Sequence, residues 1–155
     1  MAGRVDARLA ALGITVPEAA APVANYVGYV KTGNLVFVSG QVPIKDGKFL
    51  YQGKVGAEIS LDEAQEAATL CAVNIISQLK DACGGDLDKV QRIVKLGGFV
   101  NSIPEFTDQP KVINGASDLM VEVFGDAGKH ARAAVSAGAL PLNVAVEVDA
   151  VAEIA

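Results

Sequence analysis

A stripe of small and apolar residues between Ser60 and Cys83 constrains the fold more than any other feature of the sequence. Ser60 and Glu63 form a capping-box signature at the start of a helix, and Gly84 with Gly85 marks its end. The stripe recurs at steps of three and four residues, the period of one helix face: Ala64, Ala67, Ala68, Cys71, Ile75, Leu79 and Ala82. Because a helix with one apolar face must bury it, we expect this helix to pack on a β-sheet.

The rest of the chain supplies strands and two further helices. The expected strands lie on either side of a Thr32–Asn34 turn, beginning at Tyr26 and ending near Gly40, and at residues 90–100, 131–138 and 144–153. A second long helix is expected at 108–124, where Pro110 suits the first turn. A short helix is expected at 4–12.

The order of these elements predicts an α+β fold in which the helices cover one face of a mixed sheet. Residues 22–155 are expected to form this single domain, and residues 1–21 an N-terminal helix and connector. The other sheet face is left uncovered by the chain itself. We therefore expect subunits to associate.

Composition and missing motifs narrow the range of functions. The 155 residues have a net charge of −5, which argues against a nucleic-acid partner. One histidine cannot build a His-rich zinc site, and neither a nucleotide-binding glycine fingerprint nor a P-loop is present. Cys71 and Cys83 would lie too far apart on one helix to form a disulfide. Without a secretory signal or a membrane-length apolar run, a cytoplasmic location and no membrane partner are expected.

Arg132 is the most unusual side chain in the C-terminal third, because it stands alone in a long stretch of small and apolar residues. If the strands 131–138 and 144–153 are antiparallel neighbours, Arg132 and Glu147 would share a face of the sheet. The pair would then be a structural ion pair. Alternatively, Arg132 would bind a substrate carboxylate, with room left by Ala134 and Ser136, and Glu147 would position or activate a water.

A second candidate surface lies at "VFVSGQVP", residues 36–43. Ser39 offers a hydroxyl and Gly40 permits close backbone approach at the end of a strand. Both residues also suit an ordinary turn, and Tyr26 suits an ordinary strand. His130 is expected to lie at a strand edge rather than to act in catalysis.

These segments resemble the RidA (YjgF) family of reactive-intermediate deaminases, also called endoribonuclease L-PSP-like proteins. The resemblance rests on "ARAAVSAGALP" followed by "VEVDAVA", on "SGQVP", and on the Pro-rich connector that leads to Tyr26. It extends over residues 22–152. It implies a chorismate-mutase-like fold, assembled as a homotrimer with sites in the clefts between subunits.

The resemblance also implies an activity, the hydrolysis of 2-imino acids or their enamine tautomers to 2-oxo acids and ammonia without a cofactor. Arg132 would hold the substrate carboxylate and Glu147 would place the water. The residues expected to line the site are Tyr26, Ser39, Gly40, Asn114 and Ala134. Ala134 stands where the family often has cysteine, and His130 where it often has proline or a small residue.

Two other functions remain open from the sequence. A non-catalytic binder of small carboxylates, acting as a sensor or regulator, would need Arg132 but not Glu147. An endoribonuclease, which one family name implies, is opposed by the acidic balance and by the lack of a second histidine to serve as acid and base.

Overall fold

The computed structural model describes residues 3–21 and 24–155. Within them the helices are α1 (Arg4–Ala11), α2 (Leu61–Ala82) and α3 (Gln109–Phe124), with short 3-10 helices η1 (Leu87–Lys89), η2 (Gly125–Gly128) and η3 (Pro141–Asn143). The strands are β1 (Tyr29–Thr32), β2 (Leu35–Gln41), β3 (Ile44–Lys45), β4 (Lys48–Phe49), β5 (Val90–Asn101), β6 (Ala131–Ala137) and β7 (Val146–Ile154).

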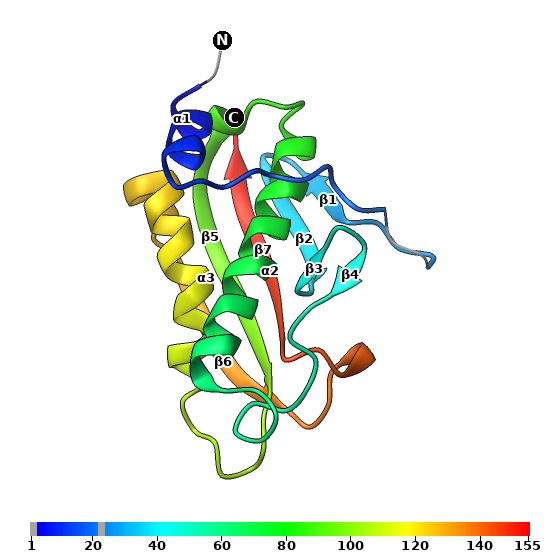
Figure 1. Ribbon diagram of the computed structural model, residues 1–155. Coiled ribbons are helices and arrows are strands. Elements are labelled where there is room, and N and C mark those ends of the chain that lie inside the picture. Colours follow the sequence, from blue (N-terminus) through cyan, green and yellow to red (C-terminus); the bar gives the residue numbers. More distant parts are fainter. Residues whose placement is uncertain (1–2, 22–23) are drawn as a thin grey trace.

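Five of these strands form one mixed sheet in the order β1-β2-β7-β5-β6, in which only the β5–β6 pair of the described strands is parallel. Helices α2 and α3 lie side by side across one face of this sheet (Figure 1). The α+β fold with two main helices on one face and a third helix at the N-terminus is confirmed. The hairpin of β3 and β4, which surrounds the turn-forming "KDGK" segment, lies outside the main sheet.

Helix α2 follows the sequence closely because both its cap and its apolar face are encoded locally. The Ser60 hydroxyl accepts a hydrogen bond from the Glu63 backbone N–H, and the Glu63 carboxylate accepts one from the Ser60 N–H. All seven residues of the predicted stripe are buried against the sheet or against α3. Cys71 and Cys83 are free thiols, as the spacing predicted.

Helix α1 belongs to the same core as the rest of the chain. Val5 and Leu9 are buried, and α1 packs on α3. The Asp88 carboxylate accepts hydrogen bonds from the backbone N–H groups of Arg4 (3.0 Å) and Val5 (2.9 Å). These bonds satisfy donors that the first turn of a helix leaves unpaired, and they hold the pKa of Asp88 below its usual value.

Two sequence predictions about the strands are wrong. The first strand begins at Tyr29 rather than Tyr26, which lies in a bend. The strands β6 and β7 are not neighbours, because β5 lies between them. The segment β5–α3–β6 is a crossover unit, which places β6 parallel to β5, while β7 pairs on its two sides with β2 and β5. The short connection between β6 and β7 suggested a hairpin of these two strands. Helix α3 instead returns the chain beside β5, so β6 pairs with β5.

Candidate functional site

Arg132 lies on the edge strand β6, where helix α3 fixes its guanidinium. Its Nη1 donates to Asn114 Oδ1 at 2.8 Å and to Ser117 Oγ at 3.2 Å. These two residues are three apart on α3, so they share one face of that helix. The Ser117 hydroxyl also lies 2.8 Å from His130 Nε2. We call Asn114, Ser117, His130 and Arg132 the arginine cluster.

The arginine cluster leaves part of the guanidinium free. Nη1 has two hydrogens, and its two acceptors account for both. Among the described residues, no group makes a hydrogen bond or an ion pair with Nε or Nη2 of Arg132. The Nε–Nη2 edge is one of the fork-shaped donor pairs that match a carboxylate. Arg132 is therefore held on one side and available for a carboxylate on another.

Glu147 lies on the central strand β7 beside the end of β2. A Cβ atom on Gly40 would collide with its carboxylate, so a glycine at this position lets the Glu147 side chain keep its place beside β2. The neighbouring Ser39 lies in an irregular stretch of the β2–β7 pairing, and its hydroxyl donates to the Val27 carbonyl at 2.6 Å. We call Ser39, Gly40 and Glu147 the glutamate cluster.

The pKa of the Glu147 carboxyl group is raised, so this group binds a proton more readily than an ordinary carboxylate. Partial burial raises its pKa above the usual value, and the Asp149 carboxylate on the same strand raises it further. Burial also raises the pKa of Asp149, partly offset by the hydrogen bond from the Gly97 backbone. A carboxylate with a raised pKa accepts a proton more readily than an ordinary one, which suits a general base.

The structure does not bring Arg132 and Glu147 together as a pair. Arg132 is in register with Leu96 and, through it, with Ala150; both are buried beneath the helices. Glu147 is in register with Phe99, whose side chain points to the opposite face. The predicted shared face was wrong, since it assumed that β6 and β7 pair directly. Arg132 and Glu147 are also separated by two strand spacings, which is a distance of about 10 Å across the sheet.

The remaining predicted residues divide between the two clusters. Asn114 joins the arginine cluster directly. Ala134 lies on the same face of β6 as Arg132, in register with Gly98. Tyr26 is 57% exposed and immediately precedes Val27, whose carbonyl binds Ser39. Ser117 was not predicted from the sequence, although its three-residue spacing from Asn114 on the expected helix is a signal that pointed to a shared face. His130 lies at the entrance to β6, as predicted.

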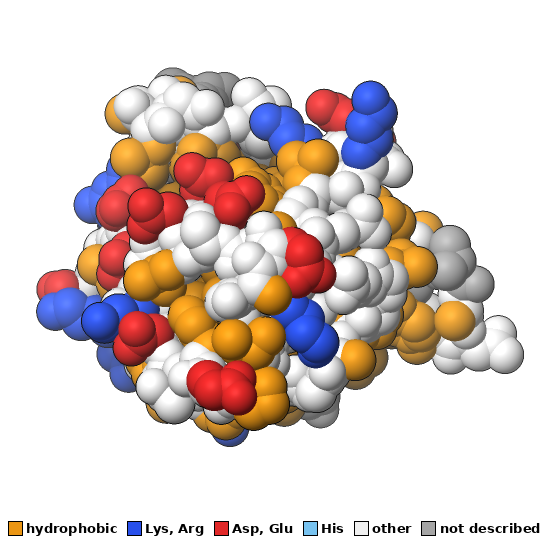
Figure 2. Space-filling view, turned by 60° about the horizontal axis from the view of Figure 1, so that its bottom comes forward, with side chains coloured by type: hydrophobic (Ala, Val, Ile, Leu, Met, Phe, Trp, Pro, Cys, Tyr) orange, Lys and Arg blue, Asp and Glu red, His pale blue; other side chains and the backbone are white. Residues whose placement is uncertain are grey.

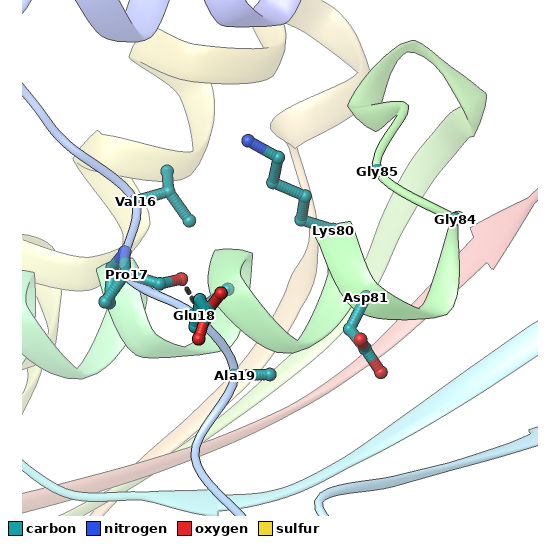
Figure 3. A pocket seen from close by; sticks show the side chains of 9 residues that line it. Val16, Pro17, Glu18, Ala19, Lys80, Asp81, Gly84 and Gly85 are labelled. Carbon is teal, nitrogen blue, oxygen red and sulfur yellow. Dashed lines mark hydrogen bonds between the residues drawn. The ribbon is translucent and has the colours of Figure 1, made fainter.

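Neither of two open grooves on the chain contains a predicted site residue. One, of about 480 Å³, lies between the connector at 16–19 and the C-terminal end of α2, where Lys80 and Asp81 line it (Figure 3). The other, also of about 480 Å³, lies between α2 and α3 and carries Asp62, Glu66, Asp118 and Glu122. Both clusters lie outside these two grooves.

The uncovered face of the sheet carries exposed apolar side chains beside charged ones. Val30, Phe37 and Val135 are each about half exposed there, at 54%, 45% and 47%. The end of the molecule that is lowest in Figure 1 shows acidic side chains between apolar ones and no continuous basic tract (Figure 2).

Two absences apply to the part of the chain that the structure describes. No three His, Cys, Asp or Glu residues in 3–21 and 24–155 are grouped as a metal site would require. Across the same residues, no helix has the length and apolar character needed to cross a membrane.

The sheet order, with two helices on one face, defines the chain as a chorismate-mutase-like α+β protein. The sequence profile described as "YjgF/chorismate mutase-like, putative endoribonuclease" matches residues 6–154. The chain belongs to this family, as the resemblance predicted.

The chain is also similar to individual proteins of this family. It is 52% identical to Protein TCP17 of Trypanosoma cruzi, with 98% of this chain and 95% of that protein covered. A crystal structure of the protein Atu1372 of unknown function from Agrobacterium tumefaciens is 51% identical, covers 97% of this chain and 92% of its own, and has a TM-score of 0.92. A protein of Dermatophagoides farinae named 2-iminobutanoate/2-iminopropanoate deaminase is 29% identical, with 89% of this chain and 92% of that protein covered.

Proposed function

We propose that the protein hydrolyses 2-imino acids, or their enamine tautomers, to 2-oxo acids and ammonia in clefts between the subunits of a homotrimer. The observation that carries the proposal is the free Nε–Nη2 edge of Arg132, because a positioned guanidinium fork is suited to a carboxylate. The deaminase named among the relatives supports the same reaction class.

The separation of the two clusters supports a cleft between subunits. Within one chain Arg132 and Glu147 lie on different faces of the sheet and on strands that β5 separates. A single small substrate would not reach both in one subunit. In a ring of three identical chains, the edge strand β6 of one copy can face the Glu147 side of the next, and the apolar sheet face would then be covered.

The chemistry needs one binding group and one group that handles water. Arg132 holds the carboxylate of the imino acid, so that the C=N carbon is fixed in position beside Glu147. Glu147 accepts a proton from the attacking water as the new C–O bond forms, and the proton passes to nitrogen. This transfer gives a carbinolamine and restores the carboxylate. Glu147 then takes the proton of the new hydroxyl group as the C=O bond forms and the C–N bond breaks, and the proton passes to the leaving nitrogen, so that ammonia and the 2-oxo acid are released. Ser39 and Gly40 line the cleft on this side, and Tyr26 contributes its ring or hydroxyl.

A mixing experiment tests both the reaction and its location. Arg132→Ala and Glu147→Gln are purified separately, and each is assayed for ammonia release from imino acids that an amino-acid oxidase generates in the cuvette. Each variant alone should lose about 10²-fold or more in rate. Equal amounts are then unfolded and refolded together. In mixed trimers about one cleft in four combines an intact Arg132 with an intact Glu147, so about a quarter of the wild-type rate should return.

Two outcomes would contradict the proposal. An unaccelerated reaction with the wild-type protein would exclude the activity. No recovery on mixing, with trimers formed, would place both residues in one subunit's site. Glu147→Gln that keeps pyruvate binding but loses turnover also separates the enzyme from the second candidate, a carboxylate-binding regulator that needs Arg132 alone.

A further inference from the structure

The side chain of His130 is tied to Arg132 through one hydroxyl group. His130 Nδ1 lies 2.6 Å from the Gly128 carbonyl oxygen, and its Nε2 lies 2.8 Å from Ser117 Oγ. A carbonyl oxygen only accepts, so Nδ1 carries the hydrogen. In the neutral imidazole Nε2 is then an acceptor, and the Ser117 hydroxyl donates to it. The same hydroxyl oxygen accepts from Arg132 Nη1.

The far end of this chain of hydrogen bonds is fixed by packing. Gly128 is buried, and a Cβ atom there would collide with the backbone of Met120 on α3. Its carbonyl therefore holds a set position relative to α3, and so does the imidazole that binds it. The two ends of the hydrogen-bond network, Gly128 and Arg132, are therefore both held against α3.

The imidazole also decides where the serine hydroxyl points. A serine inside a helix can turn its hydroxyl to the carbonyl four residues earlier, which is Ile113 here. His130 Nε2 offers a competing acceptor on the side of β6. With the hydrogen directed to His130, a lone pair of Ser117 Oγ is presented to Arg132.

We propose that Ser117 and His130 are positioning residues that fix the Arg132 guanidinium so that its Nε and Nη2 donors face a bound carboxylate. The proposal rests on the function above for the identity of the ligand. Ser117 acts on Arg132 directly, whereas His130 acts through Ser117. Neither touches the substrate, so their loss should weaken carboxylate binding while the later chemistry proceeds.

The test compares four variants with the wild type in the imine assay and in pyruvate binding by calorimetry. Ser117→Ala should raise KM and the pyruvate Kd roughly tenfold with kcat within about twofold, because one bond to a charged group is lost. His130→Ala should raise them roughly threefold, and Ser117→Thr, which keeps the hydroxyl, should stay near wild type. Asp118→Ala, at the next exposed position of α3, is the matched control and should change neither constant.

A nitrogen NMR measurement reads the geometry without relying on activity. In the wild type, Arg132 Nη1 and Nη2 should give separate signals, since Nη1 is held by two acceptors. Ser117→Ala should speed the rotation that exchanges them. His130 should show a protonated Nδ1 and an unprotonated Nε2.

The outcomes separate this proposal from the proposed function. If Arg132→Ala abolishes activity but Ser117→Ala matches wild type in KM, Kd and Arg132 signals, the positioning role is overturned and the function stands. If the wild type has no activity and binds no pyruvate, the function fails. The NMR result then decides the positioning alone: faster exchange in Ser117→Ala supports it, and unchanged exchange overturns it.

Discussion

The arginine cluster and the glutamate cluster are built in opposite ways. Arg132 is held by the hydrogen bonds that it donates to side chains on α3, which lie within eighteen residues of it along the chain. Glu147 makes no hydrogen bond through its carboxylate within the described residues; it packs against Gly40 and lies near the Asp149 carboxylate. A group that binds must be oriented before the ligand arrives, whereas a group that exchanges protons with water must stay accessible.

Replacing the Arg132 guanidinium by the ammonium group of lysine is the most severe test of how the arginine cluster binds. Arg132→Lys keeps the positive charge but loses the planar pair of donors and the contacts to Asn114 and Ser117. We expect kcat/KM for imine hydrolysis to fall about 10²-fold. Arg92→Ala, an exposed arginine on β5, is the control. A lysine variant with wild-type kinetics would show that charge alone binds the substrate.

Crowding the Glu147 carboxylate tests the role of the glutamate cluster. Gly40→Ala places a methyl group where the Glu147 carboxylate lies, so the side chain must move. We expect kcat to fall roughly tenfold with a smaller change in KM, because misplacement affects the chemical step more than binding. Gly138→Ala is a matched control, since a Cβ atom there meets no neighbour within 4 Å. Equal losses in the two variants would argue against a specific role for the Gly40–Glu147 contact.

The raised pKa of Glu147 predicts a dependence of stability on pH. As pH rises from the ordinary carboxyl value to the raised folded value, the unfolded chain gives up its proton first, so folding stability falls. At pH values above the raised folded pKa, the whole of this loss of folding stability is present. Glu147→Gln should therefore have a higher Tm than wild type at neutral pH, although it loses activity. The measurement is thermal unfolding from pH 4 to pH 8; an equal Tm at all pH values would contradict the burial effect.

The smallest effect is expected at Asp88, which supports α3 only through helix α1. Its pKa is lowered by the N–H bonds from Val5 and Arg4, so this stabilisation is present above the ordinary carboxyl value and lost as pH falls through the folded value. Asp88→Ala should expose α1 to proteolysis while KM rises less than about twofold. Asp86→Ala is a nearby comparison, because its side chain caps η1 instead. A large loss of carboxylate affinity would show that α1 reaches the arginine cluster.

The elements themselves could be predicted because their signals are local. The capping box at Ser60 and the apolar steps of α2 depend on residues that are close in sequence, and the same holds for the Pro110 start of α3. The family motifs likewise pointed to Arg132 and Asn114, which the structure shows in contact. The turn at Thr32–Asn34 was likewise predicted from local residues, and Gly33 there lies in the left-handed region.

The relations between elements could not be predicted in the same way. Whether β6 pairs with β7 or β5 depends on where α3 returns the chain, and that is a property of the packed sheet. One wrong neighbour assignment was enough to put Arg132 and Glu147 on a common face. The contact of Ser117 with His130 also arises only when α3 lies over β6.

The sequence alone determined the helices, the strand segments, the helix-covered sheet and the residues that carry the family resemblance, since each rests on periodicity, capping or short motifs. The tertiary structure decided the strand order, the opposite faces of Arg132 and Glu147, and the free edge of the guanidinium. These depend on contacts between distant segments, whose free energies no local pattern contains.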